Sequence, residues 1–280
     1  MEIIAKDNFE LKPNTFLLVN KPESWTSFDV VGYIRKKLTE KMRLEKVYPV
    51  KSGEAGLPVA KFNRVKVGHA GTLDPFATGL LIVALGREAT REIENFKNLK
   101  KTYEATIKLG EISNTGDKTG IITPFKLNSF EKLILNIKYR ILNLFSGNIQ
   151  YSVFNIFKRI PTEQEIKRLL IKFTGKQLQT PPMFSAKKIN GQRLYKLARQ
   201  GKEIKRKANK IEIFSLNLID YQYPILKIEV GCSPGTYIRT LALDIGNKLK
   251  IGAYCAELKR TKIGEYNSEK AIDLPISPGN

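Results

Sequence analysis

The spacing of hydrophobic and polar positions predicts strands in the first half of the chain. Residues 16–22 (FLLVNKP) form a short apolar run that stops at a proline, as strands commonly do. Residues 79–86 (GLLIVALG) form a continuous apolar run between glycines, which predicts a buried strand. Residues 101–110 (KTYEATIKLG) alternate between apolar and polar positions, which predicts a half-buried strand.

Two segments of the same half have helical spacing. In residues 26–38, Thr26 or Ser27 is a suitable N-cap, and the apolar residues that then recur on one face are Phe28, Val31, Ile34 and Leu38. Residues 87–96 (REATREIENF) predict a short helix. Residues 40–66 break the rhythm, because they are basic and contain glycines and a proline, and they predict an inserted loop.

The second half is predicted to mix helices and strands without regular alternation. Helices are expected at 161–175, 193–203 and 235–250, and strands at 209–222, 223–233 and 254–266. Residues 176–192 are expected to form a loop, and residues 125–160, which are apolar, basic and aromatic, a helix followed by strands. This order favours an α+β fold around a mixed, mostly antiparallel sheet.

Charge is the compositional property that says most about function. The 280 residues include 48 lysines and arginines and 27 acidic residues, which gives a formal net charge of +21. A globular protein this basic usually binds a polyanion, so nucleic acid is the favoured partner. A source organism with generally lysine-rich proteins is the alternative. The length allows one large domain or two small ones.

Several kinds of chemistry and location find no support in the sequence. It contains no P-loop and no dinucleotide fingerprint after a strand. Two cysteines, Cys232 and Cys255, and a single histidine give no basis for a metal cluster or a disulfide framework. The apolar runs are too short to span a bilayer and the N-terminus has no signal-peptide pattern, so we expect a cytoplasmic protein that does not contact membranes.

One short stretch concentrates the candidate chemistry. Residues 68–86 (GHAGTLDPFATGLLIVALG) place the only histidine, His69, shortly before Asp74 in a glycine-rich turn that leads into an apolar run. Taken alone, Asp74 and Pro75 are a common turn pair, in which the aspartate binds nearby backbone N–H groups. A single histidine is likewise more often structural than catalytic. A structural and a catalytic interpretation of this stretch both stay open at this point.

Five segments, in matching order, resemble the TruB family, the tRNA pseudouridine-55 synthases. They are FLLVNKPESWTSFDVV (16–31), GHAGTLDPFATGLLIVALGREATR (68–91), KTYEATIKLG (101–110), PPMFSAKKINGQRLYKLARQGKE (181–203) and CSPGTYIRTLALDIG (232–246), the last followed by ELKRTKIGEY. One such motif would be weak support, whereas the ordered set is specific. The resemblance implies a pseudouridine synthase fold, with helices and loops flanking the sheet and an active-site cleft across it.

The resemblance also implies the reaction and its nucleophile. In this family the uracil of a uridine is detached from its ribose, turned, and rejoined through C5, which needs no cofactor and no metal. Asp74 corresponds to the nucleophile, and a carboxylate is ionised at neutral pH without a neighbouring base. Attack on the ribose C1′, attack on the uracil C6 and a glycal intermediate are alternatives that the sequence leaves open.

Further residues match the family's site. Arg239 corresponds to the arginine that pairs with the nucleophile and would hold it ionised and oriented. Tyr103 corresponds to the tyrosine that stacks on the target base, although a lone strand tyrosine is more often part of a core. Tyr237 and Leu258 correspond to residues that line the nucleoside pocket, and core packing explains Leu258 nearly as well. His69 corresponds to a histidine that helps to hold the RNA loop.

The implied partner is the T-arm stem-loop of tRNA. A uridine inside a folded loop is stacked, so the enzyme has to extrude uridine 55 at a cost of roughly a few kcal/mol. Basic segments such as KKINGQR (187–193) and KRKANK (205–210) would offset this cost through phosphate contacts, or would simply be solvated. We expect the protein to act as a monomer.

The chain departs from the family pattern at several points. Bacterial members commonly continue into a small RNA-binding domain of the PUA type, whereas this chain ends with AIDLPISPGN, so we expect residues 1–280 to form a single catalytic domain without it. The segments 40–66 and 125–160 are interpreted as insertions. Position 70 is Ala where Thr is common.

Two other functions are alternatives. The first is a non-catalytic RNA-binding or RNA-folding protein on the same scaffold, which the presence of Asp74, Tyr103 and Arg239 argues against. The second is the related catalytic subunit of guide-RNA particles. It is disfavoured because that relative depends on a PUA domain, which we expect this chain to lack.

Overall fold

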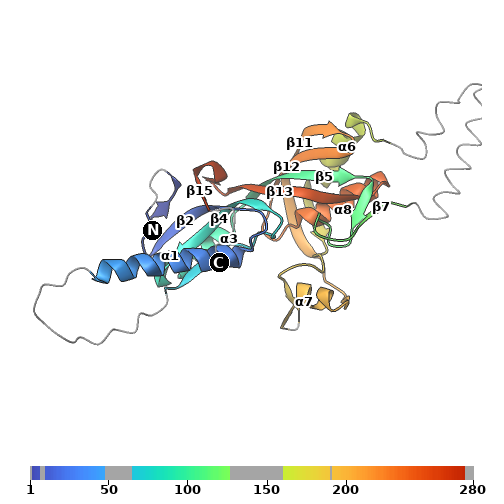
Figure 1. Cartoon of the computed structure of the whole chain (residues 1–280). Coiled ribbons are helices and arrows are strands. Elements are labelled where there is room, and N and C mark those ends of the chain that lie inside the picture. The colour runs from blue at the N-terminus through green and yellow to red at the C-terminus, as the bar shows by residue number, and fades with distance from the viewer. Residues whose placement is uncertain (1, 7–9, 48–64, 127–159, 190, 275–280) are drawn as a thin grey trace, which may run out of the picture. The chain divides into compact units, whose positions relative to one another are not determined.

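The computed structural model describes residues 2–6, 10–47, 65–126, 160–189 and 191–274 (Figure 1). Most of the predicted insertion at 125–160, and the part of the other insertion that covers 48–64, lie outside the described residues. The chain divides into two compact units. Unit 1 consists of Met1–Tyr103 and Leu258–Asn280, and unit 2 of Glu104–Glu257.

Unit 1 is built on a sheet of apolar strands. Its elements are β1 (Ile3–Ile4), β2 (Thr15–Lys21), α1 (Ser27–Val47), β3 (Val67–His69), β4 (Thr78–Leu85), α2 (Arg87–Arg91), α3 (Ile93–Lys97), β13 (Ala253–Ile263), which begins in unit 2, β14 (Tyr266–Asn267), a 3₁₀ turn (Ser268–Lys270) and β15 (Ile272–Asp273). β2 pairs antiparallel with β4, and β13 pairs parallel with β4. The strand order in the unit is β1-β2-β4-β13, with β3 added to β4 and β15 to β2.

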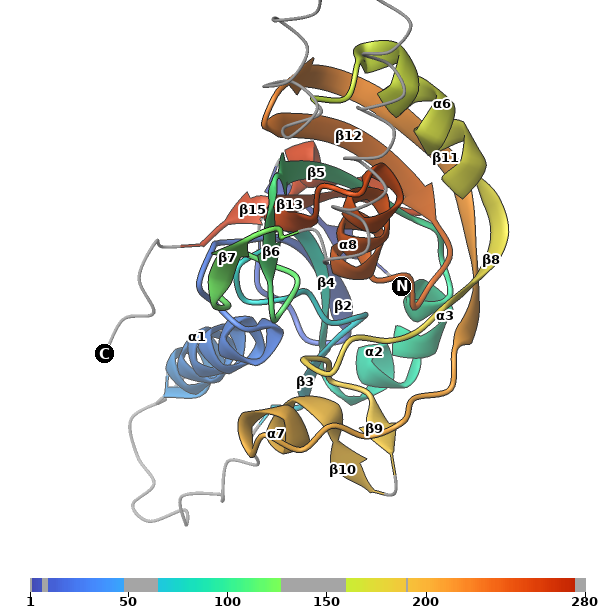
Figure 2. The same cartoon turned by 90° about the vertical axis from the view of Figure 1, so that its right-hand side faces the viewer.

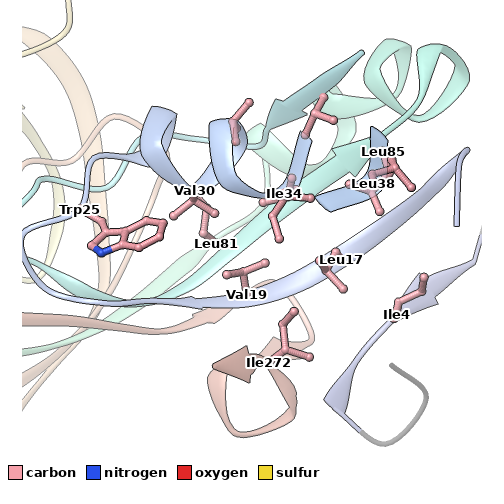
Figure 3. Close-up of a cluster of buried hydrophobic side chains, with 13 residues drawn as sticks. Ile4, Leu17, Val19, Trp25, Val30, Ile34, Leu38, Leu81, Leu85 and Ile272 are labelled. Carbon is pink, nitrogen blue, oxygen red and sulfur yellow. The ribbon is translucent and has the colours of Figure 1, made fainter. Parts of the chain in front are cut away.

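β2 and β4 are buried on both faces, which explains their continuous apolar sequences. One face packs against α1 through a cluster that includes Leu17, Val19, Leu81, Val83, Val30, Ile34 and Leu38 (Figure 3). The opposite face packs against α2 and α3. The strands contribute Phe16, Leu18, Leu80 and Ile82 to this second cluster, and the helices contribute Ala89 and the partly buried Ile93 and Phe96. Because side chains alternate along a strand, one apolar run supplies both layers.

The helix α1 begins as predicted and ends later. Thr26 is the N-cap: its Oγ1 accepts from the Asp29 N–H at 3.1 Å, and the Asp29 carboxylate accepts from the Thr26 N–H at 2.7 Å. The helix continues to Val47, through residues predicted as a loop, because TEKMRLEK contains good helix formers and no glycine or proline. The predicted apolar face is right for Val31 and wrong for Phe28, which is 59% exposed. The buried face of the helix is centred on Val30, Ile34 and Leu38, and Phe28 lies to one side of it.

Unit 2 contains the long antiparallel strands. Its elements are β5 (Lys101–Leu109), which begins in unit 1, β6 (Glu111–Ser113), β7 (Ile122–Pro124), α6 (Glu163–Phe173), β8 (Gly175–Gln179), β9 (Lys188–Ile189), β10 (Gln192–Arg193), α7 (Leu194–Arg199), β11 (Asn209–Gln222), β12 (Ile225–Cys232) and α8 (Ile238–Leu249). The strand order is β5-β12-β11-β8. β11 and β12 form the predicted antiparallel pair, and α6 packs along β11 (Figure 2).

Two local predictions are wrong in detail. Residues 175–179, predicted as the end of a helix and a loop, form β8 because they pair antiparallel with β11. The predicted helix 87–96 is two short helices that break at Glu92, whose N–H bonds to the Ala89 carbonyl in the tighter 3₁₀ manner. The α+β class with a mixed, mostly antiparallel sheet is confirmed. None of the helices in the described ranges is long and apolar enough to cross a membrane.

Candidate active site

Asp74 lies in the loop that connects β3 to β4. The two strands are antiparallel neighbours in which His69 pairs with Val83. The Ala70 N–H extends this ladder by one bond, to the Ile82 carbonyl at 2.8 Å. The loop that carries Asp74 is therefore attached at both ends to the most deeply buried strand of unit 1.

The Asp74 side chain is half-buried between buried neighbours. Leu73, Phe76 and Ala77 are each at most 4% exposed. The Ala77 N–H donates to the Asp74 carbonyl at 3.1 Å, which closes a β-turn with Pro75 at its second position, where its fixed φ is favoured. The anchored residues on both sides fix the backbone of the turn, so the loop presents one carboxylate in a defined place.

The start of α1 and the end of β2 hold this turn. The Ser27 hydroxyl accepts from the Leu73 N–H at 2.9 Å and donates to the Leu73 carbonyl at 3.3 Å. The buried Lys21 ammonium donates to the Trp25 carbonyl at 2.6 Å and to the Pro75 carbonyl at 3.2 Å. Both residues thus bind the main chain on either side of Asp74.

Arg260 of β13 holds the beginning of the same loop. It is 1% exposed, and its guanidinium donates to the Leu80 carbonyl at 2.7 Å, to Gly71 at 3.2 Å and to Thr72 at 3.5 Å. β4 can approach β13 this closely because residue 79 is glycine: a Cβ there would lie 2.4 Å from the Arg260 carbonyl oxygen.

Lys21 and Arg260 place positive charge beside the turn. In the part of the chain that the structure describes, both bond to main-chain carbonyls and neither to a carboxylate. Burial lowers the pKa of Lys21 to about 8, the negative charge of Asp74 opposes this shift, and Arg260 adds to it. Lys21 is therefore close enough to interact electrostatically with Asp74, and it is still mostly protonated at pH 7.

His69 ends β3 with a half-buried, neutral ring. Burial lowers the pKa of His69 to about 4; the positive charges of Arg260 and Lys97 add to this lowering, and a backbone hydrogen bond with Gly71 opposes it. The ring contacts Phe28 edge to face, with centroids 5.4 Å apart. A neutral ring suits a positional role rather than one that depends on charge.

The low pKa of His69 predicts a loss of stability on acidification. Between pH 6.5 and about pH 4 the unfolded chain binds a proton at His69 that the folded chain does not. The free energy of unfolding therefore decreases as the pH is lowered through this range, and the decrease ends below the pKa of His69 in the folded protein. His69→Gln should remove this pH-dependent loss of stability, which is up to about 3 kcal/mol. The measurement is urea unfolding of wild type and variant at pH 6.5 and at pH 4. Because His69 is the only histidine, NMR of its imidazole gives the pKa directly, and a midpoint near 6.5 contradicts the prediction.

Arg239 lies in the first turn of α8 and is 3% exposed. Its Nη1 lies 3.4 Å from the carboxylate of the buried Asp117 and donates to the Thr115 carbonyl at 2.9 Å, while Nη2 donates to the Phe184 carbonyl at 2.8 Å. The Asp117 carboxylate also accepts from the Thr119 N–H at 2.9 Å. The pair is buried with several hydrogen bonds to each side chain, which fixes the orientation of the guanidinium.

The backbone at the start of α8 is held by Gln179. Its side-chain oxygen accepts from the Tyr237 N–H at 2.7 Å, and its Nε2 donates to the Tyr237 carbonyl at 3.0 Å. Tyr237 is the half-buried N-cap residue of α8. Gln179 is the last residue of β8, so the strand that the sequence pattern missed positions a predicted pocket residue.

The predicted site residues divide between the two units. His69, Asp74, Tyr103 and Leu258 belong to unit 1, and Tyr237 and Arg239 to unit 2. Tyr103 is half-buried on β5, and Leu258 is 6% exposed on β13. The pairing of Asp74 with Arg239 and the cleft across the sheet stay predictions.

Sequence reasoning missed the positioning roles of the side chains that hold the predicted residues in place, which are those of Lys21, Ser27, Asp117, Gln179 and Arg260. A lysine at the end of an apolar strand is a usable signal for Lys21, because a buried ammonium needs acceptors nearby. Asp117 stands in NTGDKTG, which reads as an ordinary turn and offers no such signal. Within the described ranges, no group of His, Cys, Asp or Glu side chains could hold a metal ion.

Comparison with known proteins identifies the family. The model of the TruB family pseudouridylate synthases (N terminal domain) matches residues 60–156 and 152–238. The chain belongs to the TruB family. This TruB protein is 38% identical to tRNA pseudouridine synthase B of Parabacteroides distasonis over 262 residues, 94% of this chain and 89% of that protein. The enzymes of the same name from Bacteroides fragilis and Chlamydia felis are 36% and 34% identical over 94% of this chain and 91% and 88% of theirs. As a TruB pseudouridine synthase, the protein is an isomerase, as predicted.

Solved structures show the same fold. The TruB chain resembles a chain of a crystallised Cbf5-Nop10-Gar1 complex with a TM-score of 0.56 and 23% identity, over 97% of this chain and 56% of that one. It also resembles a chain of an H/ACA RNP bound to a substrate RNA containing 2′-deoxyuridine, with a TM-score of 0.53 and 21% identity, over 96% of this chain and 59% of that one. The chain thus spans little more than half of either of those chains. Together with the family match, the likeness confirms the predicted pseudouridine synthase fold.

Proposed function

We propose that the protein isomerises uridine 55 in the T-arm of tRNA to pseudouridine, with Asp74 as the nucleophile on a uridine turned out of its RNA loop. The observation that carries this proposal is the identity of 38% over 94% of the chain and 89% of a protein named tRNA pseudouridine synthase B. We place the reaction in the cytoplasm and expect the enzyme to act as a monomer.

The reaction requires the protein to position the uridine and to supply one anionic group. The bond between the uracil N1 and the ribose C1′ breaks, a bond between C5 and C1′ forms, the C5 proton leaves, and N1 gains a proton, so substrate and product are isomers. A carboxylate suits the nucleophilic step because it is ionised at neutral pH and can also leave again.

The surroundings of Asp74 support its role as nucleophile. Its turn is anchored by buried residues and by Ser27, and the Lys21 ammonium, which binds the Pro75 carbonyl, is close enough to interact with the carboxylate electrostatically. A rigid loop holds a reacting group in place before the substrate arrives, which reduces the entropic part of the barrier.

The remaining site residues are assigned to roles around that carboxylate. We assign Arg239 to pair with Asp74, and the bonds that fix its guanidinium support this role. Tyr103 is assigned to stack on the target base, and Tyr237 and Leu258 to line the nucleoside pocket. His69 is assigned to hold the RNA loop while the uridine is extruded, and the net charge of +21 supports binding through phosphates.

Pseudouridine mapping tests the proposal directly. Purified protein is incubated with unmodified tRNA transcripts and pseudouridine is located by chemical labelling and primer extension. A single new pseudouridine at position 55 is expected, and a matched transcript with cytidine at that position should stay unmodified. Pseudouridine elsewhere would contradict the proposed target, and RNA binding without pseudouridine would favour a non-catalytic RNA-binding protein.

A further inference from the structure

Phe28 is a large apolar residue at the surface beside the candidate site. It is 59% exposed in the first turn of α1, whereas Val31, one turn further along the helix, is 3% exposed. Isolated exposed apolar residues are common at protein surfaces, so exposure by itself carries no argument. The contacts of Phe28 distinguish it from the other exposed apolar residues.

Phe28 and His69 form an aromatic pair. Their ring centroids lie 5.4 Å apart, and the planes meet at 88°, an edge-to-face arrangement that fixes both rings. The imidazole is neutral at pH 7, because burial and nearby positive charges lower its pKa. The exposed ring of Phe28, supported by an uncharged neighbour, offers a flat, apolar face of the kind on which nucleobases stack.

This pair is attached to the turn that carries Asp74. Ser27, which directly precedes Phe28, exchanges hydrogen bonds with Leu73, which directly precedes Asp74. Phe28 and Asp74 are thus each one residue away from the same pair of hydrogen bonds, at 2.9 and 3.3 Å. A nucleotide that reaches the carboxylate brings its neighbours in the RNA close to this turn.

The charge around the pair suits an RNA strand. The positive charges of Arg260 and Lys97 interact electrostatically with the His69 ring, and the whole chain has a formal net charge of +21. Positive charge beside an exposed aromatic ring is the combination that binds unstacked nucleic acid, since the phosphates are attracted and the bases stack. A protein partner would instead require an apolar patch extending beyond one side chain.

We propose that Phe28 stacks on a nucleobase adjacent to the extruded uridine, with His69 supporting the ring from its edge. When a uridine leaves the stack, its neighbours lose a stacking partner, and an aromatic side chain can take that place. Phe28 is therefore a positioning residue that stabilises the extruded state of the RNA. This inference rests on the proposed function, because it needs an RNA from which a uridine is extruded.

The test compares aromatic and aliphatic side chains at position 28. Phe28→Leu keeps the apolar character but removes the ring, and Phe28→Trp keeps a ring. Phe214→Leu, at a 40% exposed phenylalanine on β11, is the matched control. Each protein is titrated with T-arm stem-loops that carry 2-aminopurine at one of the two positions flanking uridine 55, and single-turnover pseudouridine formation is measured in the same RNA without the label.

We expect wild type and Phe28→Trp to quench 2-aminopurine at one flanking position, because stacking quenches its fluorescence. Phe28→Leu should lose this quenching and bind about tenfold more weakly, with an unchanged dependence on salt, since no phosphate contact is removed. Phe214→Leu should behave as wild type.

The outcomes separate the two proposals. If wild type forms pseudouridine but Phe28→Leu retains both affinity and quenching, the stacking role is wrong and the proposed function stands. If Phe28→Leu and Phe214→Leu lose affinity equally, or Phe28→Trp fails like Phe28→Leu, the effect is not stacking and the inference is overturned. If wild type forms no pseudouridine in this RNA, the proposed function fails, and the inference fails with it.

Discussion

Replacing Asp74 by asparagine is expected to lower pseudouridine formation by at least about a thousandfold, the scale of loss when a nucleophile is removed. Asparagine has nearly the same size, and the turn is held by main-chain bonds to Leu73 and Pro75 that do not use the carboxylate. The amide carries no negative charge and is a far poorer nucleophile. The measurement is single-turnover pseudouridine formation in a tRNA transcript, with excess enzyme.

The affinity for tRNA should change little in the same variant. Binding depends on phosphate contacts spread over many basic residues, so one site contributes little, and removal of a negative charge works in favour of binding. Asp220→Asn, at an exposed carboxylate on β11, is the matched control and should retain both activity and affinity. Wild-type turnover in Asp74→Asn would make Asp74 a structural turn residue, and the assignment of the nucleophile would be withdrawn.

Replacing Arg239 by methionine is expected to lower the free energy of unfolding by about 3–5 kcal/mol, because it leaves the carboxylate of Asp117 buried without its cation. Asp117 is 5% exposed and Arg239 is 3% exposed, so water cannot readily replace the lost partner. Two main-chain carbonyls, those of Thr115 and Phe184, lose donors at the same time. The measurement is urea unfolding at pH 7, with the m-value compared to confirm two-state behaviour.

A surface ion pair is the control for this variant. Lys167 and Glu163 lie 2.6 Å apart on α6, and both are more than half exposed, so Lys167→Met should cost only about 0.5 kcal/mol or less. The double variant of Arg239→Met with Asp117→Asn should recover part of the loss, since it removes the uncompensated charge. If Arg239→Met is no more costly than Lys167→Met, the buried pair does not stabilise unit 2.

The same pair shows why the sequence missed part of the site. Arg239 stands in a recognisable motif, but its partners in the fold are Asp117 and the carbonyl of Thr115, which is 124 positions away in the chain. Arg260 likewise binds the carbonyl of Gly71 across 189 positions. Such contacts depend on which strands become neighbours in the sheet, and no local pattern of residues reports that order.

Phe28 and β8 were mispredicted for a related reason. The helical spacing correctly predicts where α1 begins and that Val31, Ile34 and Leu38 are buried. The packing of α1 on β2 and β4 decides where the buried face is centred, and that face includes Val30 rather than Phe28. The segment 175–179 has little strand character of its own and becomes β8 only because β11 offers it a partner.

By itself, the sequence determined the long elements, the fold class, the family and the one acidic turn that is central to the proposed chemistry. These depend on local periodicity, on a capping residue such as Thr26, and on motifs of adjacent residues, all of which can be recognised along the chain. Only the tertiary structure decided which buried cations hold the Asp74 turn, which carboxylate fixes Arg239, and which aromatic residue stays exposed beside His69. Each of these joins distant segments through hydrogen bonds or ring contacts whose geometry exists only after the strands have packed.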